Sequence, residues 1–272
     1  MRRENIVIVS DLQVGSTVGL WPKNGAPIEG GGIYLPNKPQ LWIAECWANM
    51  LERVAWLNPK PIVILNGDMT QGVNGSKDGQ INGVSTTVQL RVAYQLLEPL
   101  KAIAEKIYVM RGSEFHDGLA GQTVEGLASE LGAVPDPVTG QFSTWELYHK
   151  TSGGVIHVAH HVGKSSVPGY EATVPWREGH TLLAELKKAY RDKAPDVRVV
   201  VFSHRHRPIC VGDGLLWVMV TPGWQLKTAL GYRSGTQLLP SIGWGLIRVE
   251  DGRMSCEIMR YELPLPHIEG GE

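Results

Sequence analysis

Five short apolar segments recur along the chain, and each of them ends in polar, acidic or histidine residues. They read "NIVIVSD" (5–11), "PIVILNGD" (61–68), "KIYVMRGSEFHDG" (106–118), "GVIHVAHHVG" (154–163) and "VRVVVFSH" (197–204). A short and nearly continuous apolar run is typical of a strand that is buried on both faces. Helical patterns alternate with the first three segments, and mostly β-type patterns follow the later ones. The chain is therefore predicted to adopt an α/β fold.

The expected helices occupy much of the sequence between these strands. They are predicted at 40–57, at 86–105 with a kink near Pro99, at 123–132 ending at Gly132, and around 182–190. From residue 209 on the pattern is β-rich, with turns at 212–214 and 250–252.

Three long Gly-rich loops separate the predicted elements, at 14–39, 69–85 and 162–179. Long loops are often functional, and we expect these three to shape a substrate pocket. No repeat, linker or charge run divides the chain. We therefore predict a single domain over residues 1–272, with a frayed tail at 262–272.

The composition is that of an ordinary globular protein. Of the 272 residues 43% are hydrophobic and 19% charged, and no apolar run approaches the roughly 18–20 residues of a membrane span. The first apolar run, Ile6 to Val9, is too short for a signal peptide. The three cysteines are odd in number and lack a CxxC pair, which suits a reducing compartment, so we expect a cytoplasmic protein. A net charge of −1 speaks against a large non-specific nucleic-acid footprint.

The residues that end the five apolar segments are of the kinds that bind metal ions. They are Asp11, Gln13, Asp68, Glu114, His116, His160, His161, His204 and His206. The carboxyl ends of strands in open α/β sheets form the ligand crevice, so these side chains are expected to converge. Carboxylates together with imidazoles suit Mn, Fe, Zn, Ni or Co. Seven or eight ligands drawn from these nine residues are too many for one tetrahedral ion. They fit two ions that share a carboxylate, an arrangement known to hydrolyse phosphate esters.

The order of these residues resembles the motif run of the calcineurin-like metallophosphoesterases. That run is D-x-H, G-D-x-x-D/N, G-N-H-D/E, a strand-end H and G-H-x-H. This chain reads "DLQ", "GDMTQ", "GSEFHD", "HH" and "SHRH" in the same order, over about residues 5 to 210. The G-[ST]-E-x-H variant of the third motif is similar to that of phage and prophage members.

The resemblance implies a fold and a set of roles. The fold is a four-layer α/β/β/α sandwich of two mixed β-sheets flanked by helices, with the metal site at the C-terminal strand ends. One ion would be held by Asp11, Gln13, Asp68 and His206, and the other by Asp68, Glu114, His160 and His204. Asp68 would bridge the two ions, a hydroxide between them would attack phosphorus, and His116 would be the general acid. Arg205 is a candidate to grip the substrate phosphate, because guanidinium matches phosphate oxygens; a salt bridge to a neighbouring loop is an equal alternative.

Three positions depart from the family pattern. Gln13 stands where the family has His, and its amide oxygen is a weaker and harder donor that would favour Mn or Mg. The third motif lacks its Asn ligand, for which Glu114 is the first substitute and Ser113 the second. His161 stands where the family often has Gly, so it could be the ligand instead of His160.

The sequence thus predicts a dinuclear metal phosphoesterase acting on phosphate monoesters or diesters, with a nucleotide or DNA among the possible substrates. Manganese is the first choice of metal, with Fe, Ni, Zn or Mg as alternatives. Two other classes remain: a non-catalytic binding scaffold of the same fold, and a one-metal amidase or lactonase. The number of ions bound per chain would separate the three.

Overall fold

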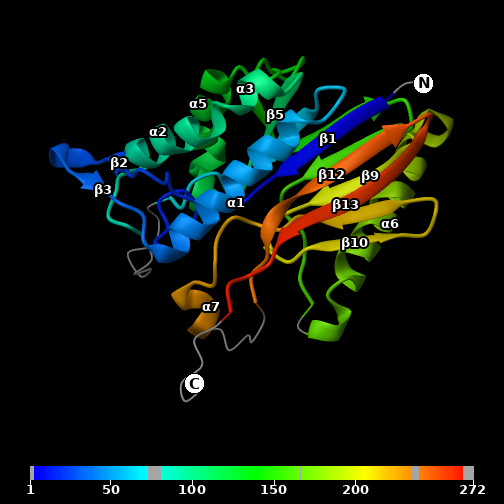
Figure 1. The fold of residues 1–272 in the computed structure, drawn as a ribbon. Helices are drawn as coiled ribbons and strands as arrows, with labels where there is room; N and C mark the ends of the chain where they lie inside the picture. Colours follow the sequence, from blue (N-terminus) through cyan, green and yellow to red (C-terminus); the bar gives the residue numbers. More distant parts are fainter. Residues whose placement is uncertain (1–2, 73–80, 166, 234–238, 266–272) are drawn as a thin grey trace.

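The computed structural model describes residues 3–72, 81–165, 167–233 and 239–265. Two mixed β-sheets form its centre (Figure 1). The six-stranded sheet has the order β13 (Arg253–Tyr261), β12 (Ile242–Glu250), β1 (Arg3–Val9), β4 (Ile62–Asn66), β5 (Lys106–Met110) and β6 (Ser143–Thr144). The five-stranded sheet has the order β10 (Ile209–Gly212), β11 (Trp217–Val220), β9 (Val197–Phe202), β8 (Gly154–Ala159) and β7 (Glu146–Thr151).

The middle of each sheet is parallel. Strands β1, β4, β5 and β6 run in one direction, as do β8, β9 and β11 in the other sheet. In the six-stranded sheet β12 pairs antiparallel with β1, and β13 pairs antiparallel with β12. In the five-stranded sheet the two edge strands, β10 and β7, pair antiparallel with β11 and β8. The carboxyl ends of parallel neighbours meet at one edge of a sheet, which is where the residues that follow them can form a site.

Helices cover the outer face of each sheet. The first group is α1 (Lys38–Ala55), α2 (Thr86–Leu97), α3 (Leu100–Ile103) and α5 (Gln122–Leu131), and α6 (Thr173–Tyr190) lies against the five-stranded sheet (Figure 1). Three apolar clusters separate the layers, and the middle one joins Ile8 and Ile64 of one sheet to Val158 and Val201 of the other. The predicted four-layer α/β/β/α sandwich is confirmed.

The predicted loop at 162–179 is wrong in its second half, because α6 already begins at Thr173. The segment was predicted as a loop because it is rich in glycine. Proline is tolerated in a first helical turn, where its missing N–H would have had no partner. Gly179 is buried where the helix lies close to the sheet: a Cβ there would come within 2.8 Å of Val218 Cγ2.

Short elements that the sequence did not indicate complete the fold. They are β2 (Ala26–Pro27), β3 (Ile33–Tyr34), α4 (Glu114–Asp117), α7 (Ala229–Arg233) and the 3-10 turns at Glu29–Gly31, Leu119–Gly121, Pro168–Tyr170 and Arg191–Lys193. The single domain stays a prediction, and most of the predicted frayed tail, 266–272, lies outside the described residues. Among the described residues, no helix is both long and apolar enough to cross a membrane.

Candidate metal centre

The predicted ligands come together where parallel strands of both sheets end. Asp11 and Gln13 follow β1, Asp68 follows β4, His160 follows β8, and His204 follows β9 with His206 two residues later. Asp11, Asp68 and His160 are each at most 1% exposed. Water cannot reach these groups freely, so each must be balanced by its neighbours or by a bound ion.

Asp68 lies at the middle of the cluster. Its Oδ2 atom is 3.1 Å from His160 Nε2, 3.6 Å from His204 Nδ1 and 3.9 Å from His116 Nε2. Its Oδ1 atom accepts hydrogen bonds from the backbone N–H and the hydroxyl of Ser113, at 2.7 and 3.0 Å. One oxygen is therefore held by the protein and the other faces three imidazoles.

Asp11 belongs to the same cluster. Its Oδ1 atom is 3.2 Å from His206 Nε2 and 4.0 Å from His160 Nε2. Its Oδ2 atom accepts the backbone N–H of His204 at 3.3 Å. His160 thus stands between the two carboxylates.

Charge controls the protonation of these groups. Burial raises the pKa of Asp68, but His160 and His204 outweigh it and hold that pKa well below its usual value. Burial likewise opposes ionisation of Asp11, and His206 and His160 lower its pKa overall. Burial lowers the pKa of His160, whereas Asp68 and Asp11 raise it to about 10.

The backbone is strained at five of the predicted ligands. Asp11, Gln13, Asp68, His204 and His206 have φ between 51° and 69°, and only three other non-glycine residues of the described chain share this left-handed region. That conformation is unfavourable for a residue with a side chain and persists only when its surroundings fix it. Such strain clusters at functional sites.

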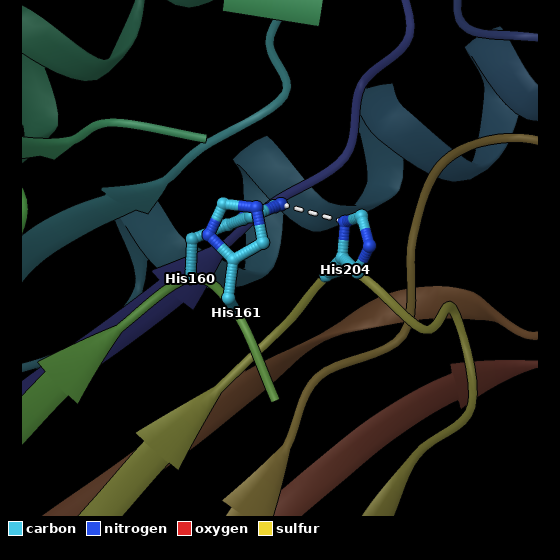
Figure 2. Close-up of side chains that lie close together, drawn as sticks. All are labelled: His160, His161 and His204. Carbon is cyan, nitrogen blue, oxygen red and sulfur yellow. Dashed lines mark hydrogen bonds between the residues drawn. The ribbon is translucent and has the colours of Figure 1, made fainter. Parts of the chain in front are cut away.

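The residues present fit divalent cations. Asp11 Oδ1 and Gln13 Oε1 are buried, and within the described structure neither accepts a well-aligned hydrogen bond. Two groups of side chains bring one possible ligand atom each within 4.8 Å of one another: Asp11 with Asp68 and His160, and His160 with His161 and His204 (Figure 2). Carboxylate, amide and imidazole donors at this spacing form a donor set for divalent metals.

The third motif is arranged differently from what the sequence suggested. Glu114 is exposed in the first turn of α4 and belongs to neither group, so its role as a ligand stays a prediction. Ser113, the second substitute, binds Asp68 instead. Sequence reasoning missed Asp117, whose buried Oδ2 accepts the backbone N–H groups of Gly112 and Asp68 at 2.6 and 3.1 Å. Burial and the nearby Asp68 raise the pKa of Asp117 to about 7.

His116 is held by Gln71, and Gln71 is held in turn by Gln225; sequence reasoning missed both contacts. The Nδ1 atom of His116 lies 2.8 Å from the backbone carbonyl oxygen of Gln71. The Gln71 side chain in turn accepts a 2.8 Å hydrogen bond from Gln225 Nε2. A carbonyl oxygen can only accept, so Nδ1 carries the hydrogen and Nε2 is turned towards Asp68. Gln71 lies within the quoted "GDMTQ" motif, whereas nothing in the sequence pointed to Gln225.

A buried chain of hydrogen bonds lies directly behind the ligands. Thr221 Oγ1 is 2.7 Å from the hydroxyls of both Ser10 and Ser203. Asn66 Nδ2 donates to Ser203 Oγ at 2.6 Å and to the carbonyl oxygen of Ala159 at 3.1 Å. Ser10, Ser203 and Ala159 immediately precede Asp11, His204 and His160. The chain therefore ties the ligand-bearing strand ends of the two sheets together.

A cavity of about 260 Å³ opens beside the cluster. It is lined by residues 204–207 and 225–228 together with Gly231, Leu239 and Pro240. The sequence predicted that three other loops would shape the pocket, but the residues lining this cavity follow β9 and β11. Arg205 lines it, while its Nη1 donates to the carbonyl oxygens of Gly163 and Glu171 at 3.1 and 3.5 Å. Its role in phosphate binding stays a prediction.

The fold and the cluster define a class: two-sheet α/β/β/α proteins with carboxylates and imidazoles at the strand ends. No family model and no curated protein sequence matches the chain. Solved structures do resemble it along most of its length. An archaeal phosphodiesterase is 12% identical, covers 94% of this chain and 99% of its own, and has a TM-score of 0.45. Vacuolar protein sorting 29 from Cryptosporidium parvum is 11% identical, with coverage of 96% and 99% and a TM-score of 0.45.

A predicted phosphoesterase from Streptococcus pneumoniae is 11% identical, with coverage of 96% and 91% and a TM-score of 0.41. At such identities and TM-scores these neighbours carry no information about the activity, substrate or metal of this chain. The likeness to phage and prophage members stays a prediction.

Proposed function

We propose that this protein is a divalent-metal-dependent phosphoesterase. The observation that carries the proposal is the surroundings of Asp68 Oδ2: three imidazole nitrogens lie within 3.9 Å of this one buried carboxylate oxygen. The second carboxylate, Asp11, has a buried oxygen without a well-aligned hydrogen bond at the edge of the same cluster. Histidines with a purely structural role would not require three ring nitrogens close to the single oxygen Asp68 Oδ2.

The donor set divides into two halves. Asp11, Gln13, Asp68 and His206 would hold one ion, and Asp68, His160 and His204 the other. Manganese is the first choice, with Fe, Ni, Zn or Mg as alternatives. When bound, such ions supply Lewis acidity to a phosphoryl group and lower the pKa of a water molecule.

The protein's own contribution to the reaction is the placement of His116. In phosphate ester hydrolysis water adds to phosphorus and the P–O bond to the leaving group breaks, so the leaving oxygen needs a proton. The hydrogen bond from His116 Nδ1 to the Gln71 carbonyl oxygen fixes the ring, and in the doubly protonated imidazole Nε2 carries the proton that it can give to the leaving oxygen. Nε2 faces the same carboxylate oxygen as the proposed ligand histidines, His160 and His204.

The substrate is proposed to be a phosphate monoester or diester, with nucleotides and DNA included. The cavity beside His204 and His206 would take the group esterified to the phosphate, and Arg205 lines it. The three cysteines are unpaired, which fits the proposed cytoplasmic location.

The test is hydrolysis of bis-p-nitrophenyl phosphate and p-nitrophenyl phosphate with Mn²⁺, Ni²⁺, Zn²⁺ or Mg²⁺ added in turn. Asp68→Asn should lower the metal-dependent rate by at least about a hundredfold, the loss that even outer partners of a metal can cause. Asp192→Asn, the same change at an exposed residue, should leave the rate unchanged. Preference between the two esters would assign diester or monoester chemistry.

A non-catalytic metal-binding scaffold is the second candidate. Gln13 favours it, because an amide oxygen binds most transition metals less firmly than the imidazole it replaces. A folded protein that binds metal yet hydrolyses neither ester with any ion would support the scaffold and overturn the phosphoesterase.

A further inference from the structure

His161 lies beside two of the proposed ligands without an evident structural task. It follows His160 directly at the end of β8 and is exposed. Its ring centroid is 5.0 Å from that of His160 and 4.9 Å from that of His204. Within the part of the chain that the structure describes, His161 makes ring contacts but no hydrogen bond or ion pair. Figure 2 shows the three imidazoles facing one another at the meeting point of β8 and β9.

The spacing of the three rings suits a shared ion. One nitrogen from each ring lies within 4.8 Å of the others. His160 Nε2 and His204 Nδ1 are 3.2 Å apart. Two imidazole nitrogens on one tetrahedral ion, each about 2.0–2.1 Å from it, would be separated by roughly 3.3 Å. The pair is therefore already at the separation that a common ion requires.

The orientation of His160 supports this reading. Its Nδ1 donates to the carbonyl oxygen of Asn66 at 2.6 Å, so Nε2 is the nitrogen available to a metal. The sequence analysis left open whether His160 or His161 is the metal ligand. In the structure His160 is buried against both carboxylates and His161 covers it from the exposed side, so the two do not compete.

We propose that His161 is a further ligand, so that the second ion is held by three imidazoles, from His160, His161 and His204, together with Asp68. This inference rests on the metal centre of the proposed function. His161 would take the place of the amide ligand that the third motif lacks, whereas Glu114 belongs to neither group of converging ligand atoms.

A consequence is that the two halves of the centre differ in chemistry. The first half offers oxygens from Asp11, Gln13 and Asp68 with a single imidazole, from His206. The second half offers three imidazoles and one carboxylate. Imidazole suits zinc, nickel and iron, whereas carboxylate and carbonyl oxygens suit manganese and magnesium. The histidine half should therefore prefer zinc over manganese more strongly than the other half does.

Metal binding tests this without reference to catalysis. The metal-free protein is titrated with Co²⁺ while the visible absorption of the bound ion is recorded, and bound metal is counted by mass spectrometry. Wild type should bind two ions. His161→Ala should weaken one of them by at least about tenfold and change its absorption, while the other keeps its affinity. His180→Ala is the matched control. His180 lies on the outer helix α6, and its imidazole pairs with Asp213.

Competition between metals gives a second readout. Dialysed against equal Zn²⁺ and Mn²⁺, His161→Ala should retain less zinc per chain than wild type. Two cobalt ions bound by His161→Ala with wild-type affinity and absorption would overturn the inference. A wild-type protein that binds no metal would overturn it together with the proposed function. A third outcome is that wild type binds two ions and His161→Ala binds one of them more weakly, yet wild type hydrolyses no ester. That outcome would uphold the inference and overturn only the proposed phosphoesterase activity.

Discussion

His160 Nδ1 lies 2.6 Å from the backbone carbonyl oxygen of Asn66, and this contact fixes which nitrogen of the ring faces the site. Asn66 is the last residue of β4 in the six-stranded sheet, whereas His160 follows β8 in the five-stranded sheet. One sheet therefore orients a ligand that the other supplies. Gly67 allows this, since a Cβ at that position would collide with the His160 ring.

Metal binding should release protons. In the metal-free protein Asp68 and Asp11 raise the pKa of His160 to about 10, so its imidazole is charged at pH 7.5. A metal needs the neutral ring, so binding should expel at least about one proton per chain, and affinity should rise with pH. Calorimetric titration of Mn²⁺ or Zn²⁺ in two buffers of different ionisation enthalpy measures this number. Equal heats in both buffers would contradict the prediction.

The same pKa predicts how the stability of the metal-free protein depends on pH. The pKa of His160 is higher in the folded state than its ordinary value of 6.5. Its contribution to the free energy of unfolding is thus fully present below pH 6.5 and is lost as the pH rises through about 10. Urea unfolding between pH 6 and pH 10 in EDTA should show this decline. His160→Gln should flatten it.

Thr221→Val should destabilise the protein without touching a ligand. The change removes a buried hydroxyl that lies 2.7 Å from both Ser10 Oγ and Ser203 Oγ, and leaves those groups without this partner. A loss of about 1–3 kcal/mol in the free energy of unfolding is expected. Urea unfolding measures it, with Thr87→Val on the exposed face of α2 as the control. Equal stability of the two variants would show that the hydrogen-bonded chain contributes little.

Gln225→Leu should impair the proposed general acid. The variant keeps the volume of the side chain but cannot donate to Gln71 Oε1, so the loop whose carbonyl oxygen holds His116 is less well fixed. We expect kcat to fall about tenfold, a part of the 10²–10⁴-fold that general acids contribute. KM should change as well, because Gln225 also lines the cavity. The pH–rate profile should also shift. Gln95→Leu, on the exposed face of α2, should change neither quantity.

Gly179→Ala should be destabilising even though alanine favours helices. Its Cβ would come within 2.8 Å of Val218 Cγ2 and 3.3 Å of Leu216 Cδ2, so α6 would have to move away from the sheet. Overpacking of this kind costs about 1–3 kcal/mol. Gly126→Ala in α5, where the added Cβ meets no atom within 4 Å, should instead be neutral or stabilising. Thermal unfolding of the two variants, compared with wild type, measures the difference.

The strands and the cluster were predictable because apolar runs and polar strand ends are local features of the sequence. The five runs correspond to β1, β4, β5, β8 and β9, and the residues after them meet as expected. The start of α6 was missed because Pro175 and Gly179 resemble loop residues until the neighbouring sheet is known. The roles of Gln225 and Thr221 could not be predicted for another reason. The partner of Gln225 is 154 positions away in the chain, and those of Thr221 are 18 and 211 positions away, so only the fold brings them together.

The left-handed backbone at Asp11, Gln13, Asp68, His204 and His206 also bears on how such a protein can change over time. Glycine would relieve the strain at each of these positions at little steric cost. A lineage with no use for the side chains would gain stability by drifting towards glycine there. The proposed metal site would be the reason that five residues with side chains are kept in that conformation.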